Sequence, residues 1–186
     1  MYQLILASGS PRRREILQSA GFSFRVVTAG VDEIHEPGEA GVDYVRRLAH
    51  SKAMAIDASP RDIVLGADTT VELDGELLEK PADAADAARM LRRLSGRLHQ
   101  VHTGICLASA EETVLDVATT EVTFAPLTAV EIDTYIASGE PFDKAGGYGI
   151  QGLASKFIER IDGCYFNVMG LPIALLYQHW RRLIEG

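Results

Sequence analysis

The sequence predicts an α/β fold built on a mixed sheet with flanking helices. In the first half of the chain, apolar stretches typical of strands alternate with segments of helical spacing. In the second half, strand-like stretches follow one another across short polar turns, which is typical of hairpins. The 186 residues are expected to form one domain, 1–186, which can be divided into two lobes.

The elements of the first half follow from apolar spacing and from residues that begin or end a helix. Ser10 is a favourable N-cap, and Pro11 suits the first helical position because no amide donor is needed there. Asp74-Gly75, between alternating residues, is a strong signal for a tight turn. A polar, acidic loop is expected over 30–41. We expect strands at 4–7, 23–28 and 63–67, a hairpin over 71–79, and helices at 11–20, 42–58 and 84–94.

Polar turns and glycines separate the elements of the second half. A polar turn at 110–112 and Asp162-Gly163 each lie between strand-like stretches. One helix stops at Ser138-Gly139, and Pro172 begins the last helix. A glycine-rich loop covers 143–152. We expect strands at 100–108, 113–124, 157–161 and 165–169, and helices at 129–137 and 172–184.

Composition argues against several classes of function. A hydrophobic content of 47% and a charged content of 24% are typical of a folded protein with a core. The net charge of −8 argues against binding to nucleic acid or to an anionic membrane, because both require a basic surface. No apolar run approaches the roughly 18 residues of a membrane span, and no basic segment marks a signal peptide. The two cysteines lack metal-ligand spacing, so we expect a reducing, cytoplasmic location.

The stretch LILASGSPRRREIL, residues 4–17, places three arginines in the first turn of a helix. The positive end of the helix dipole disfavours cations there, at a cost of a few tenths to about 1 kcal/mol each. A bound anion would remove this conflict, since a turn of small residues before a helix offers free amides to a phosphate. We therefore predict a phosphate site at the Ser8–Arg12 turn that uses Arg12 and Arg13, whereas Arg14 is expected to be solvated.

Two acidic positions are candidates for a magnesium site. Asp68 ends a predicted apolar strand, where α/β sheets place ligand-binding groups, although a turn-forming aspartate is an equally good interpretation. Glu33 lies in the acidic loop, for which solvated surface is the simpler interpretation. A magnesium site needs only one or two carboxylates together with phosphate oxygens. Glu33 and Asp68 could supply them if the fold brings the two together.

Three lysines, Lys52, Lys80 and Lys144, are candidate phosphate ligands. Each by itself is more often a solvated side chain than a ligand. Together with Arg12 and Arg13 they could neutralise a triphosphate, because an acidic protein that attracts a polyanion must concentrate positive charge in one cleft.

The stretch GYGIQG, residues 147–152, matches the dinucleotide-binding pattern GxGxxG. We reject that interpretation because the stretch does not follow a buried strand and little chain remains after it. Its backbone is instead expected to come close to another group. Gln151 could then bind a base edge through its side-chain amide.

With these residues in view, the chain resembles the Maf family of nucleoside triphosphate pyrophosphatases. The SPRRR, GADTT and DKAGGYGIQG forms resemble the dTTP/UTP branch of that family. The departures are small: Gly147 stands where Ala is common, and Thr70 where a branched apolar residue is common. The matching stretches run in the family's order over nearly the whole chain: LASGSPRRREIL, DE at 32–33, RLAHSKA, GADTTV, LEKPADAADAARMLRRLSGRLHQVHTG, DKAGGYGIQG and GCYFNVMGLP.

The resemblance implies a fold similar to the inosine triphosphate pyrophosphatases, with a curved mixed sheet and two lobes around a central cleft. It implies hydrolysis of dTTP and UTP, or of modified pyrimidine triphosphates, to the monophosphate and pyrophosphate. It also implies a divalent cation, Mg²⁺ or alternatively Mn²⁺, and a homodimer. By this resemblance Asp68 is the catalytic proton acceptor, Glu33 and Asp68 hold the metal, and the substrate-binding residues are Ser8, Arg12, Arg13, Lys52, Thr69, Lys80 and Gln151, of which Arg12, Thr69 and Gln151 set specificity.

Two other functions stay open at this point. One is a non-enzymatic regulator of septum formation and cell division, since Maf proteins have a history as septum-formation inhibitors. The other is a pyrophosphatase for non-standard purine nucleotides such as inosine triphosphate. The expected partner is a nucleoside triphosphate, with neither nucleic acid nor membrane.

Overall fold

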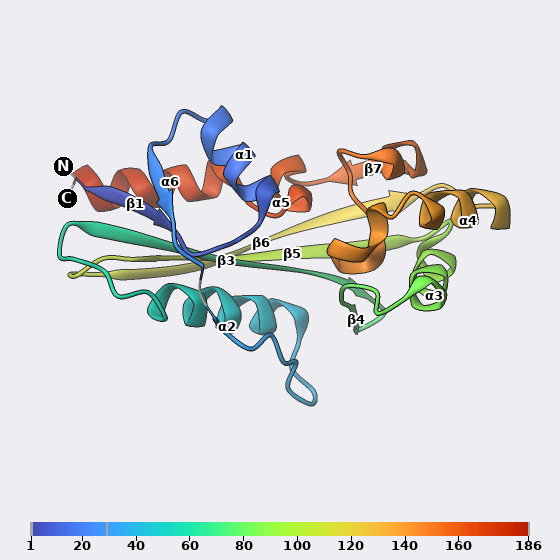
Figure 1. The fold of residues 1–186 in the computed structure, drawn as a ribbon, viewed down its shortest axis with the longest axis horizontal. Coiled ribbons are helices and arrows are strands. Elements are labelled where there is room, and N and C mark those ends of the chain that lie inside the picture. Colours follow the sequence, from blue (N-terminus) through green and yellow to red (C-terminus); the bar gives the residue numbers. More distant parts are fainter. Residues whose placement is uncertain (1, 29, 186) are drawn as a thin grey trace. The chain divides into compact units, whose positions relative to one another are not determined.

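The computed structural model describes residues 2–28 and 30–185. It contains a seven-stranded mixed sheet in the order β2-β1-β3-β5-β6-β7, with β4 paired to β3 (Figure 1). The predicted mixed α/β fold is therefore confirmed. The strands are β1 (Gln3–Leu6), β2 (Phe24–Val26), β3 (Asp62–Leu73), β4 (Glu76–Leu78), β5 (Leu98–Ala108), β6 (Thr113–Phe124) and β7 (Ile158–Asp162), and the helices are α1 (Pro11–Ser19), α2 (Gly41–Met54), α3 (Ala84–Leu94), α4 (Ala129–Ala137), α5 (Tyr165–Met169) and α6 (Ile173–Glu185).

The chain divides into two compact units. Unit 1 consists of Met1–Thr69, Thr103–Ala118 and Gly170–Gly186, and unit 2 consists of Thr70–His102 and Thr119–Met169. The strands β3, β5 and β6 contribute residues to both units. The helix bounds at 84–94 and 129–137 agree with those predicted from the sequence. No helix of the described residues is both long and apolar enough to cross a membrane.

In unit 1, glycines in the sheet allow α2 to pack directly on the strands. A Cβ at Gly66 of β3 would lie 2.1 Å from the Ala49 carbonyl oxygen, and one at Gly104 of β5 would lie 2.3 Å from that of Val45. Any larger residue at these positions would push the helix away from the sheet. Figure 1 shows α2 on one face of the unit 1 strands and α1 and α6 on the other. This packing determines where the side chains of α2 can reach.

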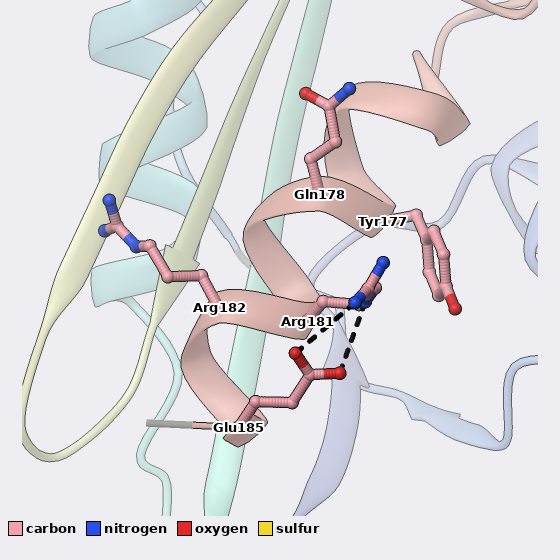
Figure 2. Close-up of a pocket in the computed structure, with 5 residues that line it drawn as sticks. All are labelled: Tyr177, Gln178, Arg181, Arg182 and Glu185. Atoms are coloured by element: carbon pink, nitrogen blue, oxygen red, sulfur yellow. Dashed lines mark hydrogen bonds and ion pairs between the residues drawn. The ribbon is translucent and has the colours of Figure 1, made fainter.

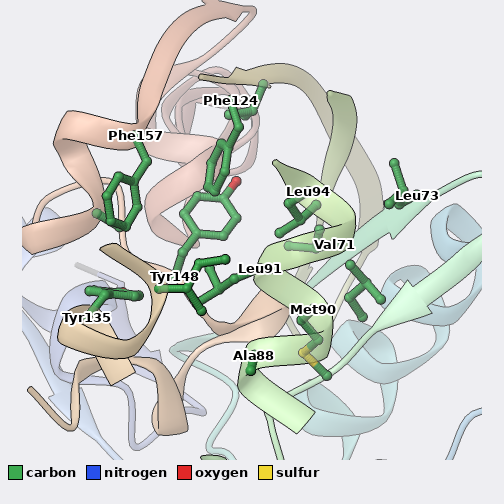
Figure 3. Packing of buried hydrophobic residues seen from close by; sticks show 14 of the residues in the cluster. Val71, Leu73, Ala88, Met90, Leu91, Leu94, Phe124, Tyr135, Tyr148 and Phe157 are labelled. Carbon is green, nitrogen blue, oxygen red and sulfur yellow. The ribbon is translucent and has the colours of Figure 1, made fainter. Parts of the chain in front are cut away.

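In unit 2, an aromatic cluster anchors the glycine-rich loop. Tyr148 lies with its ring 4.8 Å from that of Phe124, near Leu91 (Figure 3). Its hydroxyl is 2.7 Å from Nε2 of buried His99. Burial lowers the pKa of His99 to about 4, so the imidazole is neutral at physiological pH. The loop is therefore attached to the core through a residue in its middle.

The structure changes the type of one predicted element. Residues 165–169, expected as a strand, form the helix α5. A short apolar run does not distinguish a strand from a buried helical turn. The helix places Asn167 in the core, where it is fully buried and donates through Nδ2 to Val101 O at 3.0 Å and to Thr120 Oγ1 at 2.9 Å. Gly163 has a φ of +130°, which differs from the value near +90° at the second central residue of a type I′ hairpin turn.

A second correction concerns Asp68. The strand β3 continues from Asp62 through Leu73, so Asp68 lies in its interior and not at its end. The apolar run 63–67 and the first arm of the predicted hairpin are one continuous strand. The hairpin turn itself is confirmed, because Asp74 and Gly75 have φ values of 55° and 78° between paired Leu73 and Glu76.

Candidate active site

The turn before α1 has the predicted capping geometry. The Ser10 side chain accepts a hydrogen bond from the Arg13 amide at 3.4 Å, and Pro11 occupies the first turn. The Ser10 amide donates to Ser8 Oγ at 3.2 Å. The side chain of Ser8 thus closes the turn, and its hydroxyl lies at the start of the helix.

Arg13 is buried and does not extend along the helix axis into solvent. Its guanidinium donates to three oxygens: Nε to Gly170 O at 2.8 Å, Nη1 to Ser8 Oγ at 3.0 Å, and Nη2 to Thr69 Oγ1 at 3.1 Å. Thr69 Oγ1 in turn lies 2.9 Å from Thr103 Oγ1. The structure therefore brings together three predicted substrate-binding residues, together with Thr103, which no sequence signal indicated. Arg12, on the same helix, is half-buried.

Lys52 joins the two predicted acidic residues. Its Nζ lies 2.5 Å from Glu33 Oε1 and 2.6 Å from Asp68 Oδ1. Lys52 and Asp68 are buried, whereas the Glu33 side chain is 38% exposed. One ammonium thus holds a carboxylate from a loop beside a carboxylate from the centre of a strand. The condition set from the sequence, that the fold bring Glu33 and Asp68 together, is met.

Burial raises the pKa of Asp68 above its ordinary value, while the positive charges of Lys52 and Arg13 oppose the shift. The net effect makes Asp68 a better proton acceptor than an exposed carboxylate. Burial also lowers the pKa of the Arg13 guanidinium, and the charges of Asp68 and Glu33 oppose that shift. An arginine remains a cation under these conditions.

The donor set of Glu33 and Asp68 suits one type of metal ion. No group of three or more His, Cys, Asp or Glu side chains placed to hold a metal occurs among residues 2–28 and 30–185. Mg²⁺ commonly binds through one or two carboxylates and takes its other ligands from water and substrate phosphates. The two carboxylates therefore fit magnesium held jointly with a phosphate ligand, and do not form a protein cage.

The loop that carries Glu33 is fastened to α2 by Arg47. The guanidinium donates to both carboxylate oxygens of Glu39, at 2.7 and 2.6 Å, and to Ile34 O at 2.9 Å. Bidentate pairs of this kind fix geometry as well as charge. The sequence predicted solvated surface here, and neither Arg47 nor Glu39 carried a signal. Glu33 is exposed, but its loop is held in place.

Arg47→Ala should loosen this loop. We expect amide hydrogen exchange over 32–39 to become about tenfold faster, because the bidentate pair and the bond to the Ile34 carbonyl are lost. Arg46→Ala is the matched control, since Arg46 pairs with the exposed Asp43 three residues earlier on the same helix. If amide exchange over 32–39 were equally fast in Arg47→Ala and Arg46→Ala, Arg47 would not hold the loop.

The remaining predicted residues belong to unit 2. Lys80 is exposed and follows β4 by two residues, and Gln151 is exposed in the glycine-rich loop. Lys144 donates to Asp143 Oδ1 at 2.6 Å and to Glu140 O at 2.7 Å. The roles assigned to Lys80 and Gln151 stay predictions.

The surface hollow in Figure 2 contains none of the predicted site residues. It lies on α6 and is lined by Tyr177, Gln178, Arg181, Arg182 and Glu185. Arg181 Nε donates to Glu185 Oε1 at 3.2 Å within the same helix. The lining side chains thus come from successive turns of one exposed helix, unlike the cluster around Lys52.

Comparisons with known proteins agree with the motifs of the sequence. The family model described as Maf-like protein matches residues 3–183. A protein of Koribacter versatilis named dTTP/UTP pyrophosphatase is 53% identical over 96% of this chain and 93% of its own length. A protein of Salmonella typhimurium with the same name is also 53% identical, over 96% of this chain and 91% of its own length.

Solved structures show a weaker likeness. The Ham1 protein of Staphylococcus aureus is 17% identical, with a TM-score of 0.47 over 66% of this chain and 72% of that one. A nucleoside-triphosphatase of Mycobacterium abscessus, also titled dITP/XTP pyrophosphatase, is 18% identical, with a TM-score of 0.44 over 68% of this chain and 76% of that one.

Proposed function

Because this chain belongs to the Maf family, we propose that it hydrolyses dTTP and UTP to the nucleoside monophosphate and pyrophosphate. The observation that carries the proposal is the contact of Lys52 with both Glu33 and Asp68. This contact brings together a buried proton acceptor, Asp68, a second carboxylate for a metal, Glu33, and a cation for phosphate, Lys52. Relatives that are about half identical over nearly their whole length, and are named dTTP/UTP pyrophosphatase, support the choice of substrate.

In the reaction, Asp68 accepts a proton from a water molecule whose oxygen attacks the α-phosphorus. The bond from the α-phosphorus to the bridging oxygen breaks, and pyrophosphate leaves with the electron pair. A divalent cation held by Glu33 and Asp68 would supply Lewis-acid polarisation of the phosphate oxygens. One oxygen cannot bind the metal and also accept the proton, so the two roles of Asp68 require different oxygens, of which Oδ1 also accepts from Lys52.

Cations of the chain balance the charge of the triphosphate. Arg13 and Lys52 lie in unit 1 with Asp68, and we assign Arg12 and Lys80 the same task. The amides of the Ser8–Arg12 turn bind phosphate oxygens at the positive end of α1. Phosphoryl transfer depends mainly on such positioning and electrostatic stabilisation.

Arg12, Thr69 and Gln151 are assigned to selection of the base. Thymine and uracil both present a carbonyl, an imide N–H and a second carbonyl. A glutamine amide can donate to one carbonyl and accept from the imide, whereas cytosine lacks that proton. Gln151 is exposed and therefore open to a ligand.

The proposal also includes magnesium as the metal, the cytoplasm as the location and a homodimer as the assembly. Magnesium is supported by the two hard carboxylates at Lys52. Sedimentation of the purified protein with and without Mg²⁺ tests the assembly.

The test of function is a panel of nucleoside triphosphates with Mg²⁺: dTTP, UTP, CTP, GTP, ITP and 7-methyl-GTP. Fast release of pyrophosphate from dTTP and UTP supports the proposal. Preference for ITP would favour the purine alternative. Orthophosphate in place of pyrophosphate, or no release from any substrate, would contradict the enzymatic proposal and favour the regulator of septum formation.

The activity should depend on pH through Asp68. The ionised carboxylate is the active form, so kcat/KM should fall about tenfold per pH unit below the pKa of Asp68. Burial raises that pKa above the ordinary value of 3.8, whereas a cation bound to the carboxylate would lower it, so the position of the acidic limb should depend on the Mg²⁺ concentration. Lys52→Met should move the limb to still higher pH, because the ammonium stabilises the ionised form. If the acidic limb of the kcat/KM profile lies at the same pH in Lys52→Met as in wild type, a group other than Asp68 titrates there.

A further inference from the structure

The glycine-rich loop around Gln151 is held on both sides by one carboxylate network. Glu140 Oε2 accepts a hydrogen bond from the Leu153 amide at 2.9 Å. Glu140 Oε1 accepts from the Tyr135 hydroxyl at 3.0 Å, and that hydroxyl accepts from the Gly149 amide at 3.3 Å. The amides of residues 149 and 153 are thus both tied to this network, and Gln151 lies midway between them.

The glycines of the loop leave room for the close approach of this network. A Cβ at Gly152 would lie 2.2 Å from Glu140 Oε1, and one at Gly149 would lie 2.7 Å from Lys144 Cε. A side chain at either position would displace the Glu140 carboxylate or the end of the Lys144 side chain. Lys144 Nζ also donates to Glu140 O at 2.7 Å. The group that the loop backbone approaches is therefore the Glu140 carboxylate, packed beside the Lys144 stem.

Tyr135 is suited to a permanent donor role. It is almost fully buried, and burial together with Glu140 raises the pKa of its hydroxyl. The hydroxyl therefore stays protonated at any pH at which the protein works. It can donate to Glu140 while accepting from Gly149, and both bonds persist together.

We propose that Glu140, acting through Tyr135 and the Leu153 amide, is a positioning residue that orients Gln151 for pyrimidine selection. This inference rests on the proposed function. The side chain of Gln151 is exposed, so the backbone on either side must aim its amide. An amide distinguishes uracil from cytosine only if its donor and acceptor both meet the base, and small misplacements are costly.

The experiment compares kcat/KM for UTP and CTP in four variants with Mg²⁺ present. Tyr135→Phe keeps the ring and removes the hydroxyl. Glu140→Gln keeps one acceptor but turns an NH₂ group toward one of the two donors. Asp133→Asn is the control, because Asp133 is an exposed acid on the same helix as Tyr135. Gln151→Glu removes the proposed base contact itself and serves as the reference.

We expect the UTP-to-CTP ratio to fall about tenfold or more in Tyr135→Phe, Glu140→Gln and Gln151→Glu, and to remain unchanged in Asp133→Asn. A ratio that falls in Gln151→Glu alone would overturn the positioning role and leave the proposed function intact. An unchanged ratio in Gln151→Glu, or wild-type protein that releases no pyrophosphate from UTP, would overturn the proposal together with its premise. If Tyr135 and Glu140 had a purely structural role, their replacement would lower kcat/KM for UTP and CTP equally. The UTP-to-CTP ratio would then stay unchanged in these two variants, which would contradict the proposal.

Discussion

Asp68→Asn should lower kcat for pyrophosphate release from dTTP and UTP by about a thousandfold or more. The amide has nearly the shape of the carboxylate, but it does not accept a proton at neutral pH and is a poorer metal ligand. General-base catalysis alone contributes about 10²–10⁴ in rate. The measurement is pyrophosphate release at saturating substrate and Mg²⁺, with orthophosphate followed in parallel.

Thermal unfolding distinguishes this chemical loss from a loss of folding. The pKa of Asp68 is raised in the folded state, so the folded protein binds the proton more tightly than the unfolded chain. The stability that this group contributes is present at low pH and is lost as the pH rises through the raised pKa. Asn resembles the protonated form, so Asp68→Asn should be at least as stable as wild type at pH 7. An active Asp68→Asn protein would exclude Asp68 as the proton acceptor.

Arg13→Lys should lower kcat/KM by roughly 10²–10³ although the positive charge is kept. The guanidinium reaches Ser8, Thr69 and Gly170 with three separate nitrogens, and a single ammonium on a flexible stem does not reproduce that fork. Acceptors left unpaired in a buried place should also cost about 1–3 kcal/mol of unfolding free energy. Steady-state kinetics and urea unfolding measure the two effects.

Arg14→Lys is the matched control for this prediction. Arg14 is the next residue of the same helix and is exposed. Both its activity and its stability should remain near those of wild type. If Arg13→Lys also kept full activity, charge alone would suffice at this position and the hydrogen-bonded fork would have no role in catalysis.

The local pattern predicted most elements because residues at their ends, such as N-caps, mark where they begin and end. The helix at 84–94 begins at the Asp83 N-cap and the one at 129–137 at the Thr128 capping box, so their bounds depend on neighbouring residues alone. The error at 165–169 has the opposite cause. That segment carries buried Asn167, which hydrogen-bonds to residues 47 and 66 positions earlier in the chain, and a local pattern does not register such distant contacts.

The same division applies to the candidate site. The sequence by itself determined the residue types of the site. These are arginines at a helix start, where cations are unfavourable, and acids and lysines that no local structural rule explains. They also include a glycine-rich loop that does not follow a buried strand as a dinucleotide-binding loop does. It did not determine that Arg13 turns inward to Gly170. Local rules describe the cost of a residue at its position, but they do not indicate which distant group offsets that cost.

Only the tertiary structure decided that positions 33, 52 and 68 meet at one ammonium, and that Glu140 fills the space left by Gly152. The first contact joins a loop to a helix and a strand farther along the chain, and it depends on packing, such as α2 seated on Gly66 and Gly104, and not on propensity. The second joins Glu140 to a glycine 12 positions later, at a separation that no regular helix or strand brings into contact. Hydrogen bonds and ion pairs act over a few ångströms, so a pattern in sequence can name the partners, but only the folded backbone brings them within reach.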